Sequence, residues 1–184
     1  QNEIGCTALM HVAMQGHAQL VELLLGRGAV VDLQDSNGAT ALMYAATKGH
    51  AQVVQLLLVR GAALDLQNSK GGTALMAAAH QEHVQVVELL LDRGAALNLQ
   101  SSDGGTALMN AALEGNTQVV ELLLDRGAAV DLQNSDGRTA LWLAAFNGNA
   151  QLVELLLGRG AAVDLQDSDG RTTLWLAAFN GNAQ

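Results

Sequence analysis

The sequence predicts an all-α solenoid of stacked repeats, each with two antiparallel helices followed by an extended, β-hairpin-like arm. A threonine recurs every 33 residues and begins nearly the same four-residue motif each time, TALM, TALW or TTLW. An Ala-rich segment and then a Leu-rich segment, both of helical length, follow it. A fixed period of this size is typical of units that cannot bury their apolar faces alone. The recurring threonines are Thr7, Thr40, Thr73, Thr106, Thr139 and Thr172.

The first helix of each repeat begins after this threonine, as the fifth repeat illustrates. Thr139 has a hydroxyl suited to capping a helix N-terminus, and Ala140 is a strong helix former at the first helical position. We expect the helix to run through Ala145 and to end near Gly148. Glycine readily takes the left-handed conformation that closes a helix.

The second helix is expected over residues 150–157, and Gly160 ends it. This segment is apolar on nearly every side, so neighbours must cover more than one of its faces. Residues 163–166 (VDLQ) then form an extended arm, and residues 167–170 (DSDG) form a turn, because Asp, Ser and Gly favour turns. One arginine per repeat stands at the end of the second helix, where its charge opposes the negative helix end. These are Arg27, Arg60, Arg93, Arg126 and Arg159.

This repeat resembles the ankyrin repeat, and the resemblance covers the whole chain. The segments of the fifth repeat that match the family are TALWLAA at 139–145, GN at 148–149, VELLL at 153–157 and RGA at 159–161. The family usually has Thr-Pro-Leu-His where this chain has no proline and has Met or Trp in place of His. The resemblance implies a concave face of arm tips and first helices that binds another protein without catalysis.

We expect a single domain over residues 1–184, with repeats starting near residues 2, 35, 68, 101 and 134 and a partial one at 167. Neither end carries the polar capping repeat that such arrays usually have, which favours a fragment of a longer array. Uncapped terminal repeats would also permit end-to-end self-association. Residues 135–151 and 168–184 are identical apart from Ala140 against Thr173, which indicates a recent duplication.

Composition argues against several classes of protein. An apolar content of 49% is too high for a disordered chain, and no run of apolar residues is long enough to span a membrane. The net charge of −9 argues against nucleic acid as a partner. The single cysteine, Cys6, cannot form an internal disulfide, which favours an intracellular and cytoplasmic location.

The sequence carries no pattern for a catalytic, cofactor-binding or metal site, so we predict that the protein is not an enzyme. His17, His50 and His83 share one repeat position, and the simplest interpretation is a hydrogen bond within each repeat. His80 and His83 are spaced like two metal ligands, but no third ligand is evident. Glycines follow the repeat and do not form a phosphate-binding loop.

The candidate site consists of positions that vary within an otherwise rigid repeat, because folding does not dictate them. Aromatic residues and arginines, which are enriched where binding energy concentrates, gather in the last two repeats. The candidate protein-binding residues are Tyr44, Lys48, His80, Gln81, Asn110, Glu114, Arg138, Trp142, Phe146, Asn147, Arg171 and Phe179.

Two alternatives stay open at this point. The first alternative is that these aromatic residues have a structural role and do not bind a partner. Trp142 and Trp175 replace the Met of earlier repeats and would pack between repeats, and Phe146 and Phe179 would stack on each other. The alternative function is an architectural spacer or self-associating segment of a larger protein. Such a spacer would leave the concave face solvated.

Overall fold

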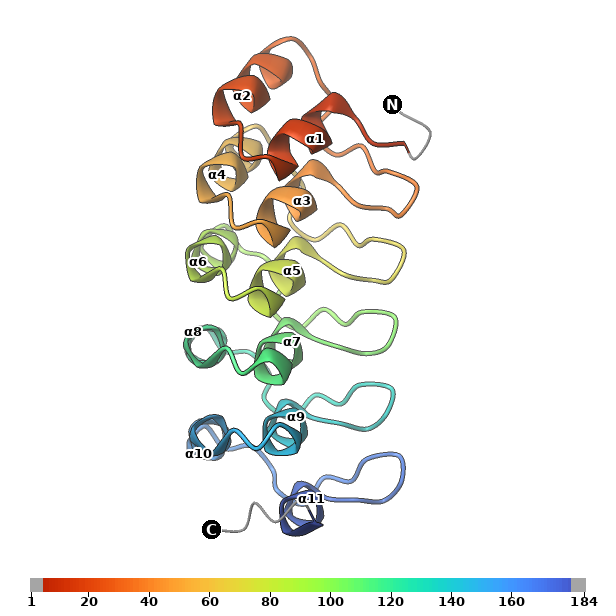
Figure 1. Cartoon of the computed structure of the whole chain (residues 1–184), viewed down its shortest axis with the longest axis vertical. Coiled ribbons are helices and arrows are strands. Elements are labelled where there is room, and N and C mark those ends of the chain that lie inside the picture. The colour runs from red at the N-terminus through yellow and green to blue at the C-terminus, as the bar shows by residue number, and fades with distance from the viewer. Residues whose placement is uncertain (1–4, 180–184) are drawn as a thin grey trace. The chain divides into compact units, whose positions relative to one another are not determined.

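The computed structural model describes residues 5–179, with side chains up to residue 176. These residues form eleven α-helices and no strand, with a single β-bridge between Gln166 and Thr172 (Figure 1). The first helices of the repeats are α1 (Ala8–Met14), α3 (Ala41–Thr47), α5 (Ala74–His80), α7 (Ala107–Glu114), α9 (Ala140–Phe146) and α11 (Thr173–Phe179). The second helices are α2 (Ala18–Gly26), α4 (Ala51–Val59), α6 (Val84–Asp92), α8 (Thr117–Asp125) and α10 (Ala150–Gly158). The predicted helical-repeat solenoid is confirmed.

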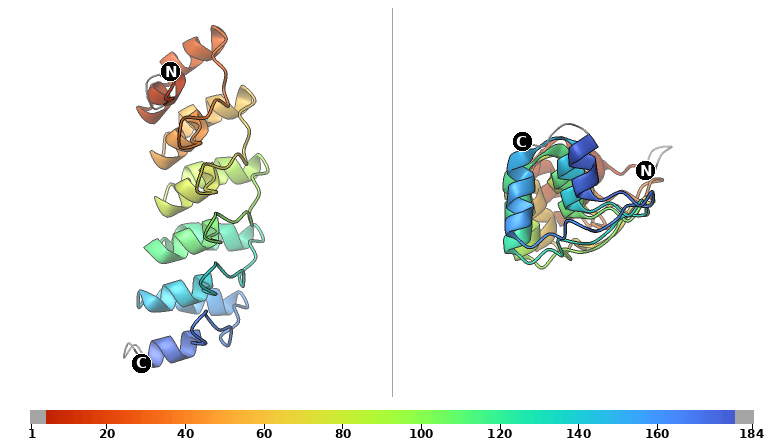
Figure 2. Two further views of the ribbon diagram at one scale, coloured as in Figure 1. Left: turned by 90° about the vertical axis from the view of Figure 1, so that its right-hand side faces the viewer. Right: turned by 90° about the horizontal axis from the view of Figure 1, so that it is seen from below.

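The chain divides into two compact units, residues 1–96 with α1–α6 and residues 97–184 with α7–α11. Within each unit the first helices form one layer and the second helices another, and the arms project from the side of the first helices (Figures 1 and 2). In the first unit α3 packs against α1, α4 and α5. In the second unit α9 packs against α7, α10 and α11. The expectation of one domain over residues 1–184 stays a prediction.

The recurring threonine caps the first helix, as predicted. The hydroxyl oxygen of Thr40 accepts a hydrogen bond from the backbone N–H of Met43 at 3.3 Å, and that of Thr139 accepts one from Trp142 at 3.2 Å. Both threonines are buried. Each cap of this kind stabilises a helix by about 1 kcal/mol, which favours starting every repeat at the same residue.

The core of each unit combines small residues of the first helices with branched residues of the second. In the first unit Ala45, Ala46, Val54 and Leu57 are fully buried. The same positions of the fourth repeat are also fully buried in the second unit. Alanine allows the two helices of a repeat to approach closely, so the exposed residues of the first helices stand on a rigid support.

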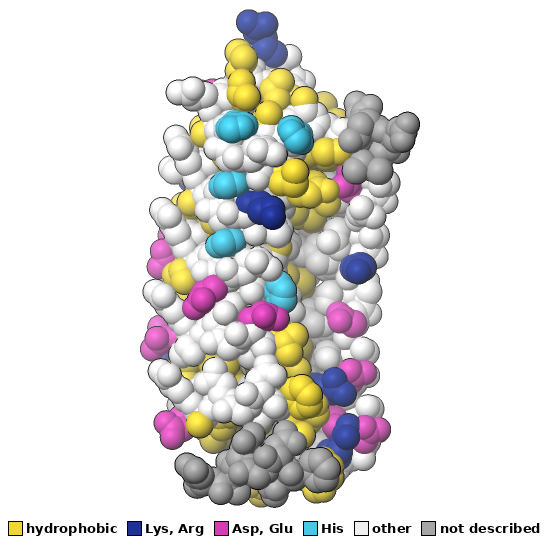
Figure 3. Space-filling view, in the orientation of Figure 1, with side chains coloured by type: hydrophobic (Ala, Val, Ile, Leu, Met, Phe, Trp, Pro, Cys, Tyr) yellow, Lys and Arg dark blue, Asp and Glu magenta, His cyan; other side chains and the backbone are white. Residues whose placement is uncertain are grey.

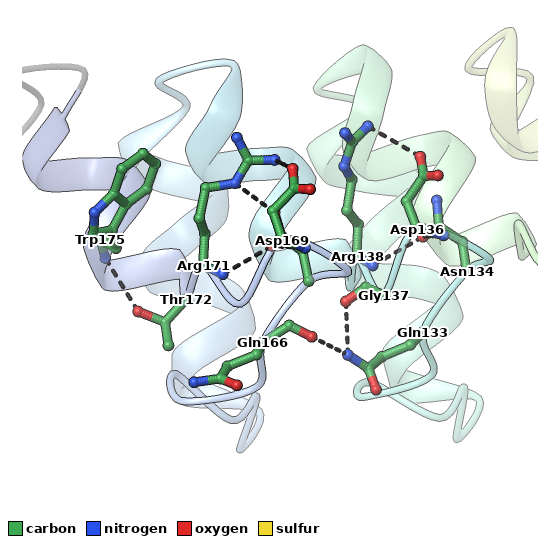
Figure 4. Close-up of polar contacts among 11 residues, drawn as sticks. Gln133, Asn134, Asp136, Gly137, Arg138, Gln166, Asp169, Arg171, Thr172 and Trp175 are labelled. Atoms are coloured by element: carbon green, nitrogen blue, oxygen red, sulfur yellow. Dashed lines mark hydrogen bonds and ion pairs between the residues drawn. The ribbon is translucent and has the colours of Figure 1, made fainter.

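Hydrogen bonds tie neighbouring arms to each other. The side-chain amide of Gln133 donates to the carbonyl of Gly137 at 2.6 Å and to that of Gln166 in the next arm at 2.9 Å (Figure 4). Gln34 makes the same pair of bonds in the first unit, to Gly38 and Gln67. The arms therefore present a surface that is ordered before any partner arrives.

Two histidines join neighbouring repeats, and this corrects the interpretation that each hydrogen-bonds within its own repeat. Nε2 of His50 lies 3.0 Å from the carbonyl oxygen of Met14, and Nε2 of His83 lies 3.1 Å from that of Thr47. Both acceptors belong to the preceding first helix, which sequence spacing alone did not reveal. The His83 ring lies so close to Gly49, which has a φ of 72°, that an added Cβ would be 2.6 Å from Nδ1.

Candidate protein-binding surface

We use the term inner face for the exposed side chains of the first helices and the adjoining arms, taken separately in each unit. In the first unit Lys48, His80 and Gln81 are exposed on it and Tyr44 is half-buried. Outside this face lie the histidines at the N-termini of the second helices, which are His17, His50 and His83. Histidine side chains are seen in the first unit in the space-filling view (Figure 3). The inner face of the first unit is therefore largely polar.

Tyr44 is held in place by a carboxylate at the base of its arm. Its hydroxyl donates to Oδ2 of Asp35 at 2.7 Å, and this bond raises the pKa of Tyr44 to about 12. Burial alone would raise the pKa of Asp35, but hydrogen bonds from Tyr44 and from the backbone of Ala39 and Asn37 outweigh it and lower the pKa. Tyr44 thus has a structural partner within its own repeat.

The inner face of the second unit carries an exposed apolar strip. Leu113 and Phe146 occupy the same position in successive repeats, and they are 40% and 53% exposed. Beside them Glu114 and Asn147 are exposed and Asn110 is half-buried. The side-chain amide of Asn147 donates to the carbonyl of Leu113, which links the two repeats beneath the strip.

Phe146 and Arg138 both contact the ring of Trp142. The rings of Trp142 and Phe146 are 5.3 Å apart between centroids and 11° from parallel. The Cζ atom of Arg138 lies 4.4 Å from the centroid of the Trp142 ring, which is a cation–π contact. Trp142 itself is only 4% exposed, so it packs within the unit and supports its two neighbours. The side chain of Phe179, and with it the expected Phe146–Phe179 stack, lies outside the described residues.

The sixth repeat places the same residue types in a different setting. Its arginine, Arg171, donates from Nε to Asp167 at 3.0 Å and also pairs with Asp169 (Figure 4). Burial alone would raise the pKa of Asp167, but bonds from the backbone and side chain of Arg171 and from the backbone of Asp169 lower it. Trp175 is 45% exposed, unlike Trp142. Two nearly identical local sequences therefore give two different surfaces.

Asn134 makes the surroundings of Arg138 differ from those of Arg171, and the sequence alone did not single it out. It stands one position before the duplicated segment 135–151, and its counterpart is Asp167. A comparison of the two copies extended by one residue would have found this difference. The described residues contain no group of three potential metal ligands, and none of their helices is long and apolar enough to cross a membrane.

A family model of ankyrin repeats, three copies long, matches residues 1–68, 50–134 and 108–184. The chain belongs to the ankyrin-repeat family. The comparison with curated proteins gives no match. Ankyrin repeats are in general protein–protein interaction modules, and the family is typically non-catalytic.

Proposed function

We propose that this ankyrin-repeat protein is a non-catalytic scaffold whose protein partner binds the inner face of the second unit. The exposed Phe146 carries the proposal, because it is a large aromatic ring left half in solvent and backed by a buried tryptophan. The corresponding positions of the first unit hold Met14, Thr47 and His80. Aromatic and Arg side chains near the centre of an interface supply most of its binding energy.

The rigidity of the arms supports the same proposal. Gln133 and its hydrogen bonds to two arms hold the surface around Arg138 in one arrangement. A surface that is already ordered loses little conformational entropy on binding, so more of the contact energy is available as affinity.

Pairing of the basic side chains favours a protein over nucleic acid or a membrane as the partner. Arg60 lies 3.3 Å from Glu22, and Arg159 lies 3.0 Å from Asp125. These arginines stand at the ends of second helices and are partly neutralised there. Phosphate-rich partners require clusters of uncompensated Lys and Arg.

Alanine substitutions on the inner face test the proposal against a purified partner. Phe146→Ala and Arg138→Ala should each weaken binding by about 1–2 kcal/mol. Gln118→Ala and Gln151→Ala, at exposed positions of the second helices, are the matched controls and should change it by less than about 0.5 kcal/mol. Unchanged affinity for both inner-face variants would contradict the proposal.

Self-association is a second candidate function, and it has its own observation. Leu20 on α2 is 46% exposed, whereas its counterpart Val53 in the next repeat is 1% exposed. Leu174 on α11 is likewise exposed, whereas its counterpart Leu141 is buried. A second copy of the chain would cover such apolar surfaces. Sedimentation at increasing concentration tests this: Leu20→Ser should reduce association, and a wild-type protein that stays monomeric throughout would exclude it.

A further inference from the structure

We propose that Arg138 is the carboxylate-recognising residue of the second unit, and that it selects a partner segment with an acidic side chain beside a bulky apolar one. This inference rests on the proposed binding role of the inner face and adds the chemistry of the partner. Three features carry it: the partners of the two duplicated arginines, the identity of residue 134, and the exposed Phe146, which shares the Trp142 ring with Arg138.

Arg171 already has the carboxylates that a partner would otherwise supply. Asp167 accepts from Nε of Arg171, and Asp169 pairs with the end of the same guanidinium. The side chain of Asp167 is almost completely buried, so its bond to Arg171 is shielded from solvent. A guanidinium engaged in this way gains little from a further carboxylate.

Arg138 lacks the equivalent of the buried carboxylate. Its Nε is buried with no hydrogen-bond partner among the described residues. Among the described residues its one ion pair is with the exposed Asp136, 3.3 Å from Nη1, and an exposed ion pair contributes little. Figure 4 shows the two arginines side by side with these different partners.

The cause of the difference is Asn134. Its side-chain oxygen accepts from the backbone N–H of Asp136 at 3.1 Å and of Arg138 at 2.8 Å, as Oδ1 of Asp167 does in the next arm for Asp169 and Arg171. The remaining group of an asparagine is an amide NH₂, which donates and so cannot accept from a guanidinium. Arg138 therefore pairs with one exposed carboxylate of its own repeat, whereas Arg171 pairs with an exposed and a buried one.

The surroundings of Arg138 define what it would bind. Its guanidinium lies against Trp142, which limits its orientation. Because Nε is buried, a partner carboxylate would accept two parallel hydrogen bonds from the two Nη groups and compete with the exposed Asp136 for Nη1. Phe146, which stacks on the same Trp142 ring, is an exposed apolar side chain that the same partner segment would reach, and Leu113 occupies the equivalent position of the preceding repeat. The chain's net charge of −9 does not prevent such binding, because charges beyond about 8 Å are largely screened at physiological salt.

Selection of random displayed peptides on the wild-type chain tests the proposal. The selected peptides should carry Asp or Glu beside Phe, Trp, Leu or Met. Arg138→Gln should weaken their binding by about tenfold or more, because a hydrogen bond to a charged group is lost. Arg171→Gln is the matched control and should leave affinity nearly unchanged.

Asn134→Asp gives a readout that a merely structural role would not produce. It supplies Arg138 with a half-buried carboxylate where Arg171 has Asp167, so it should raise the midpoint of unfolding. The same change should weaken peptide binding by about tenfold, since Arg138 is then occupied. Loss of binding in a more stable protein cannot result from unfolding.

The outcomes separate this inference from the proposed function. Peptides that need Phe146 but carry no acidic residue, or that bind Arg138→Gln and Asn134→Asp as well as the wild type, would overturn the inference alone. Peptides that bind Phe146→Ala unchanged would contradict the proposed face itself, and so would a selection without binders.

Discussion

Replacement of Glu82 by glycine should stabilise the first unit, because Glu82 occupies a left-handed position. Its φ of 58° is the only positive value among the described non-glycine residues. Other repeats place glycine there, and Gly49 has a φ of 72°. A residue with a side chain costs roughly 1–2 kcal/mol in this conformation. The greater freedom of glycine in the unfolded chain offsets about 0.4–1 kcal/mol of that gain.

The net stabilisation from Glu82→Gly is therefore about 1 kcal/mol, which corresponds to about 2–4 °C in Tm for a chain of this size. Chemical denaturation followed by circular dichroism measures this change in the free energy of unfolding. The dependence of that free energy on denaturant concentration is compared with that of the wild type. Glu82→Ala is the control: it removes the exposed carboxylate but keeps the strained backbone, so it should change stability by less than about 0.5 kcal/mol. An unchanged or lower midpoint for Glu82→Gly would refute the argument from backbone strain.

Three further predictions follow from contacts of Gly49, Asp35 and Asp167. Gly49→Ala should destabilise the protein by more than about 2 kcal/mol in denaturation, because left-handed strain adds to a clash with the His83 ring. Tyr44→Phe should cost about 1 kcal/mol and raise the pKa of Asp35 in a titration followed by NMR, because Asp35 loses its hydroxyl donor. Asp35 and Asp167 have pKa values below the ordinary 3.8, so their stabilising effect is complete above about pH 4 and is lost as pH falls below it. Acid titration of the unfolding midpoint checks this, and stability that is constant below pH 4 would contradict it.

The local elements of the fold could be predicted from the sequence because local signals encode them. Thr139 as a cap and the start of α9 at Ala140 follow from side-chain chemistry within one turn of helix. The left-handed backbone at Glu82 follows from comparison with the glycines of other repeats. These features do not depend on how neighbouring repeats pack.

Features that depend on packing between repeats could not be predicted in this way. The partner of His83 is a carbonyl of the preceding repeat, which its own repeat does not encode. Trp142 and Trp175 stand in nearly the same local sequence, TALW and TTLW, yet Trp142 is buried and Trp175 is exposed, because exposure depends on the residues packed around each ring. The difference between Arg138 and Arg171 depends on a single residue four positions upstream, whose effect shows only in the hydrogen-bond geometry.

Site-specific photo-crosslinking tests the central claim, that a protein partner lies on the inner face of the second unit, most directly. A photoreactive phenylalanine analogue replaces Phe146 in one variant and Gln118, an exposed position on α8, in the other. Both variants are irradiated in complex with the purified partner. We predict a covalent adduct from position 146 and none from position 118. An adduct from position 118 alone, or equal adducts from both positions, would contradict the claim.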